Sequence, residues 1–142
     1  MTIRKRGVDF VDFSSLVLMQ KDKESGFLNK ELGSFEVGQG ALYVKKFYEI
    51  DNKVIMVFDT NKDVEEWEYS AIYDMFDYDL FSEKGYEVED IDEEFNPTWK
   101  VEFGYAEHAE DMKEIIYDIC ETIDEAMAKV FFDIQDKEEQ YK

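Results

Sequence analysis

The apolar and polar residues of the first 58 positions follow a pattern that is typical of β-strands. Apolar residues either alternate with polar ones or run together over short stretches, and turn residues separate these stretches. The pattern predicts four strands, over 15–20, 27–37, 41–50 and 54–58, joined as an antiparallel meander. The Gly38-Gln39-Gly40 segment between the second and third strands is predicted to be a turn.

Residues 63–81 fit two different periodicities. Apolar residues recur three and four positions apart from Trp67 to Met75, and Asp63 with Glu66 matches a helix capping box. Apolar and polar residues also alternate along the same stretch, as they would in a strand. The capping box favours a helix, and a strand is the alternative.

The C-terminal part predicts a hairpin and then a long helix. Residues 86–91 and 99–105 alternate as two strands around the only proline, Pro97. Over 111–137, seven apolar residues recur at helical spacing: Met112, Ile116, Ile119, Ile123, Met127, Val130 and Ile134. The predicted fold class is therefore α+β. An antiparallel sheet of five or six strands is covered by this helix, and a second, shorter helix lies near 63–81. We expect a basic tail over 1–7 and a single domain over 8–142.

Charge is distributed unevenly along the chain. The formal net charge is −20, and residues 1–58 hold nine Lys or Arg against eight Asp or Glu, whereas 59–142 hold seven against 28. Residues 59–96 alone contribute 15 acids and two lysines. Such a surface repels nucleic acids and anionic membranes and attracts basic proteins, although acidity can also serve solubility alone. The longest apolar runs are too short for a membrane-spanning helix.

The candidate chemistry is sparse. Asp59, Asn61 and Asp63 match the start of a calcium loop, but Val64 and Ser70 replace the glycine and the glutamate that such a loop needs. These three residues are therefore a weak metal candidate, and a turn is the favoured interpretation. His108 and Cys120 are each the only residue of their type, so no zinc signature or intrachain disulfide can form. We expect no cofactor.

Acidic residues interleaved with aromatic ones form the candidate interaction site. Between 73 and 81, each of three aromatic residues is followed by an aspartate, and six of the eight residues from 87 to 94 are acidic. Rows of carboxylates at this density resemble the phosphates of a nucleic acid and fit the basic groove of a protein that binds one. The favoured interpretation of this stretch is the ordinary pattern in which the aromatic residues are core and the acids are solvated. The candidate residues are Asp74, Asp77, Asp79, Glu89, Asp90, Asp92, Glu93 and Glu94.

These observations favour a non-catalytic, acidic binding protein whose negative half meets a basic protein partner. An inhibitor or immunity-type protein of a nucleic-acid-binding protein is one version of this function. A small enzyme or ligand-binding module, with a pocket between sheet and helix, is the alternative. We expect a monomer or homodimer in the cytoplasm that binds neither nucleic acid nor membranes directly. The composition is similar to that of small proteins from AT-rich bacterial genomes.

Overall fold

Six strands form one mixed sheet in the computed structural model, which describes residues 14–142. The predicted basic tail over 1–7 lies outside the described residues. The strands are β1 (Ser14–Lys21), β2 (Leu28–Val37), β3 (Val44–Ile50), β4 (Lys53–Asp59), β5 (Glu87–Ile91) and β6 (Thr98–Gly104). The helices are η1 (Gln39–Tyr43), α1 (Glu66–Met75), α2 (Asp79–Ser82), α3 (Ala109–Asp133) and α4 (Glu138–Tyr141). The order of strands across the sheet is β2-β1-β3-β4-β6-β5.

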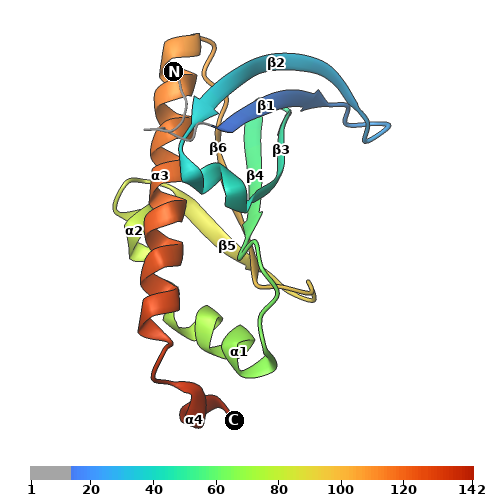
Figure 1. Ribbon diagram of the computed structural model, residues 1–142. Helices are drawn as coiled ribbons and strands as arrows, with labels where there is room; N and C mark the ends of the chain where they lie inside the picture. The colour runs from blue at the N-terminus through green and yellow to red at the C-terminus, as the bar shows by residue number, and fades with distance from the viewer. Residues whose placement is uncertain (1–13) are drawn as a thin grey trace, which may run out of the picture.

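The long helix α3 lies against the sheet, and the α+β class is confirmed (Figure 1). Its predicted apolar stripe is the buried stripe, from Met112 to Ile134. On the sheet side, Val54, Met56 and Phe58 are fully buried, because alternate residues of a strand point to the same face. α3 begins two residues before and ends four residues before the predicted bounds.

The predicted meander of the first four strands is wrong. β1 pairs antiparallel with β2 on one side but parallel with β3 on the other, where Met19 is opposite Tyr48. The short 3-10 helix η1 occupies positions where a turn and the start of the third strand were expected, and it carries the chain past β1. Alternation of apolar residues determines the face on which a side chain lies, but not which strand becomes the neighbour.

The helical interpretation of 63–81 is confirmed, although the stretch forms two helices rather than one. The chain is extended at Phe76, which separates α1 from α2. The capping box lies two residues later than predicted, because the backbone N–H of Glu65 donates to Glu68 Oε1 at 2.8 Å. The predicted C-terminal hairpin is confirmed as the antiparallel pair β5 and β6.

Gly40 allows η1 to contact the backbone of α3. A Cβ atom at this position would lie 1.9 Å from the carbonyl oxygen of Cys120. That distance is far shorter than van der Waals contact, so the role of this glycine is close approach between two backbone segments. The Gly38-Gln39-Gly40 segment therefore fixes the crossing from β2 to β3 against the helix.

Replacing Gly40 by alanine is expected to lower the free energy of unfolding by about 1–3 kcal/mol, the usual cost of overpacking a core. Gly104→Ala is the matched control, because a Cβ atom there would have no atom within 4 Å. We expect the control to leave stability unchanged or to raise it by up to about 1 kcal/mol. Urea unfolding followed by circular dichroism measures both variants. Equal effects would contradict the close contact between η1 and α3.

Candidate functional site

Two tyrosines of α1 tie this helix to the turn between β5 and β6. The hydroxyl of Tyr69 donates to the carbonyl of Glu94 at 2.9 Å. The hydroxyl of Tyr73 lies 3.1 Å from the carbonyl oxygen of Ile91 and 3.2 Å from that of Thr98, and it accepts the Thr98 N–H at 2.9 Å. These bonds bring the acids of two separate sequence stretches to the same part of the molecule.

A second polar contact anchors the segment between α1 and α2. Trp99 Nε1 donates to the hydroxyl of Tyr78 at 3.1 Å. Burial raises the pKa of Tyr73 and of Tyr78, and the negative charge of Asp90 raises both further. Both tyrosines therefore stay protonated at neutral pH and act as structural hydrogen-bonding groups.

Two of the eight predicted interaction residues are paired with lysines of the same chain. Asp77 Oδ2 lies 2.7 Å from Lys129 Nζ, a contact that lowers the pKa of Asp77. Glu89 Oε1 lies 3.7 Å from Lys100 Nζ. Such ion pairs reduce the charge that a partner would encounter. These two acids are poorly suited to contact a partner.

The other six predicted acids have no ion pair within residues 14–142. All six are exposed. We call them the acidic rim: Asp74, Asp79, Asp90, Asp92, Glu93 and Glu94. Asp90 lies on the edge strand β5, and Asp92, Glu93 and Glu94 lie in the turn after it, which Tyr69 of α1 contacts. Asp79 lies on α2, which packs on β5, and Asp74 lies on α1. One member, Asp74, accepts a hydrogen bond of 2.9 Å from Tyr141.

The weak metal candidate at the end of β4 has the geometry of a turn. Lys45 Nζ donates to Asn61 Oδ1 at 2.7 Å and lies 3.8 Å from Asp59 Oδ1, which also accepts the Asn61 N–H at 2.7 Å. Asp63 accepts a hydrogen bond from Asn96 instead of facing the other two residues. An ammonium group thus occupies the position where a cation would be needed. Among the described residues, no group of three or more Asp, Glu, His or Cys side chains is placed to hold a metal ion.

The single cysteine and the single histidine lie apart from the acidic rim. Cys120 is buried inside α3, and burial raises the pKa of its thiol to about 12. A thiol with this pKa stays protonated and is a poor nucleophile. His108 is exposed at the N-cap position of α3, where its side chain makes no capping hydrogen bond.

Glu49 of β3 is a buried acid that was not among the residues predicted from the sequence. Within the strand predicted over 41–50, nothing in the alternation distinguishes this acid from the other polar residues. In the structure Glu49 is only 4% exposed, and its Oε1 atom accepts no hydrogen bond from the described residues. The one available signal was that this acid lies between Tyr48 and Ile50, two residues before the tight turn that begins at Asp51.

Comparisons with known proteins establish the family. A family model described as "Family of unknown function (DUF6762)" matches residues 11–142. The chain belongs to this family. No curated protein and no solved structure matches the chain. Of the helices in the described part of this family member, none has the length and apolar character needed to cross a membrane.

The Tyr73 hydroxyl is expected to be essential for fixing α1 over the β5–β6 turn. Tyr73→Phe leaves the Thr98 N–H and two carbonyls without this partner, so we expect the free energy of unfolding to fall by about 1–3 kcal/mol. Tyr69→Phe is the control, because its single bond is solvent-exposed. We expect this change to cost less than about 1 kcal/mol. Chemical denaturation measures both, and a larger loss for Tyr69→Phe would refute the central role of Tyr73.

Proposed function

We propose that this protein is a non-catalytic binding protein that contacts a basic protein partner through the acidic rim. One observation carries the proposal: six exposed carboxylates on β5, on the turn after it and on α1 and α2 have no ion pair inside the described part of the chain, whereas Asp77 and Glu89 are paired. Unpaired surface charge of one sign raises the rate at which an oppositely charged partner associates.

The rigid support beneath the rim favours binding over simple solubility. Hydrogen bonds from Tyr69 and Tyr73 and the aromatic packing around Trp99 fix α1 against the sheet. A preformed surface loses less conformational entropy when a partner binds. The acids on β5 also discourage pairing with the edge of another copy of the sheet, because like charges would meet there.

The partner we propose is a protein with a basic groove, such as a nucleic-acid-binding protein that the rim would inhibit. The turn after β5 provides the densest row of carboxylates, at Asp92, Glu93 and Glu94. Asp74 and Asp77 are a weaker mimic of phosphates, because Asp77 lies outside α1, in the segment between α1 and α2, and is bound by Lys129. This protein would act as a cytoplasmic monomer or homodimer with no direct affinity for nucleic acid. A bacterial origin fits the composition.

Apolar side chains fill the interface of sheet and long helix, which argues against the alternative pocket there. Met56 and Phe58 of β4 and Ile119 and Ile123 of α3 are all fully buried in one cluster. A ligand site would need space and converging polar groups. The packing therefore supports a surface function for this part of the molecule.

Neutralising the acidic rim is expected to weaken binding of a basic probe. We would replace Asp90 and Asp92 with Asn, and Glu93 and Glu94 with Gln, and measure binding of a fluorescent deca-lysine peptide by anisotropy over a range of salt concentrations. The expected loss of affinity is about tenfold or more, corresponding to about 1.4 kcal/mol. Binding by the variant should also depend less steeply on salt, because fewer charges are screened.

A second variant with the same net charge is the control. Glu107, Glu114, Glu121 and Glu125 are exposed acids in or just before α3, and all four would be replaced with Gln. Its affinity is expected to stay within about threefold of the wild type, because charges beyond about 8–10 Å are screened at ordinary salt. If both variants lose affinity equally, total charge alone drives binding and the proposal fails.

A further inference from the structure

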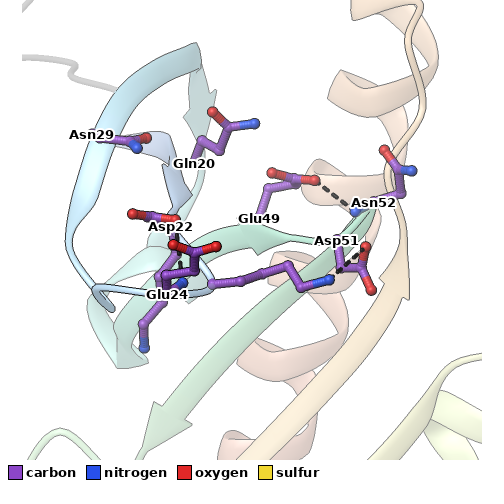
Figure 2. A pocket seen from close by; sticks show the side chains of 9 residues that line it. Gln20, Asp22, Glu24, Asn29, Glu49, Asp51 and Asn52 are labelled. Atoms are coloured by element: carbon purple, nitrogen blue, oxygen red, sulfur yellow. Dashed lines mark hydrogen bonds and ion pairs between the residues drawn. The ribbon is translucent and has the colours of Figure 1, made fainter.

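A cavity of roughly 490 Å³ lies between the β1–β2 loop and the β3–β4 turn. All nine residues that line it are polar or charged. Figure 2 shows Asp22 and Glu24 on one side, from the β1–β2 loop, and Asp51 and Asn52 of the β3–β4 turn on the other. The volume is within the range of small-molecule sites, and the polar lining suits a hydrophilic ligand.

Glu49 provides a buried carboxylate to this cavity. Its side chain points into the space between the two loops (Figure 2). Oε2 accepts the backbone N–H of Asn52 at 2.7 Å, whereas Oε1 accepts no hydrogen bond from residues 14–142. The residue is only 4% exposed, so little solvent reaches its side chain.

Burial of a carboxylate oxygen that accepts no hydrogen bond raises the free energy of the folded protein, and a donor from a ligand would remove this cost. An unsatisfied buried polar group costs about 1–3 kcal/mol, and more when the group is charged. A cationic donor offsets this cost best, because it supplies both the hydrogen bond and the opposite charge. The geometry at Glu49 Oε1 is therefore complementary to an ammonium or guanidinium group.

The walls of the cavity are already ordered by internal hydrogen bonds. Asp22 accepts the Glu24 N–H at 3.2 Å and the Ser25 hydroxyl at 2.9 Å, and these bonds lower its pKa. On the other side, Asp51 and Asn52 have positive φ angles, as a two-residue hairpin turn requires. These bonds hold the two walls in place before a ligand binds, which lowers the conformational entropy lost on binding.

The charges around the cavity favour an organic cation over a metal ion or an anion. Four carboxylates line it, against the two lysines Lys21 and Lys23. Lys23 lies 3.6 Å from Asp51, and Lys21 stands 4.5 Å from the ring centre of Tyr48. In the described part of the chain, no three acidic, histidine or cysteine side chains converge closely enough for a metal ion.

We propose that this cavity binds a small, hydrophilic organic cation through a primary ammonium group that donates to Glu49 Oε1. The amides of Gln20 and Asn29 are available to polar groups of the ligand. At the entrance, Glu24 attracts a second positive charge beside Asp51, which Lys23 already pairs. This site is separate from the acidic rim and does not depend on the function proposed for it.

Calorimetry with 1,4-diaminobutane tests the proposal, with 1,4-butanediol as the uncharged probe of the same length. We expect the wild-type protein to bind the diamine with a Kd below about 1 mM. The diol should not bind detectably, because it supplies no positive charge. Failure of the diamine to bind, or equal binding of the diol, would overturn the proposal.

The variant Glu49→Gln should lose diamine binding while remaining folded. Glutamine keeps an oxygen for the Asn52 N–H and removes an uncompensated buried charge, so we expect a melting temperature equal to or above that of the wild type. Glu110→Gln, at an exposed position of α3, is the matched control and should bind as the wild type does. Diamine binding that survives Glu49→Gln would identify adsorption of counterions to the acidic surface and refute the site.

A second variant tests the site without touching the buried group. Glu24→Gln with Asp51→Asn removes two exposed charges at the entrance, and asparagine tolerates the positive φ of position 51. We expect weaker but measurable diamine binding. Unchanged binding would contradict the placement of the second charge.

The tripeptide Gly-Lys-Gly tests whether the ammonium group belongs to a free amine or to a lysine side chain of a partner protein. Tighter, Glu49-dependent binding of Gly-Lys-Gly than of the diamine would assign the ammonium group to a protein. The reverse order would assign it to a small molecule. Deca-lysine binding to the acidic rim should be unchanged in Glu49→Gln, so failure of one site is distinguishable from failure of the other.

Discussion

The packing of Trp99 positions most of the groups to which we assign a function. Its ring is fully buried in β6 and stacks on Phe76 at 4.2 Å and on Phe58 at 5.5 Å between ring centres. Phe58 belongs to β4, and Phe76 separates α1 from α2, so one side chain joins the sheet to both helices. Aromatic side chains bury large apolar areas and gain further energy from stacking. The acids of the rim lie on the segments that this cluster fixes.

The sequence predicted the parts of the fold that depend on local periodicity. The buried stripe of α3 and the apolar strand β4 followed from spacing alone, because core residues must return to the same face. The parallel pairing of β1 with β3 was not predictable in this way, since it depends on η1 and on the contact of Gly40 with Cys120. That contact joins residues 80 positions apart, which a local pattern does not report.

The candidate site was predictable only in part, for a similar reason. The density of acids is visible in the sequence, whereas the pairing of Lys129 with Asp77 and of Lys100 with Glu89 is not. The burial of Glu49 depends on its place at the end of β3 and on two loops that close around it. Residue type gives the charge of a side chain, whereas exposure and partners come from tertiary structure.

The two proposed sites use negative charge in different ways. The acidic rim is exposed, so it acts over a distance and is screened by salt. Glu49 is buried, so it acts through direct contact and is less sensitive to salt. We thus propose that the same chain combines a surface for a large basic partner with a cavity for a small cation.

The central claim is that acids from separate stretches of the sequence form one binding surface around β5. An NMR titration of the isotopically labelled protein with deca-lysine, followed through its backbone amide signals, tests it most directly. We predict that the signals of residues 74–79 and 90–94 shift together, with one shared affinity, while those of β2 stay unchanged. Shifts spread evenly over all exposed acids, or different affinities for the two segments, would contradict the claim.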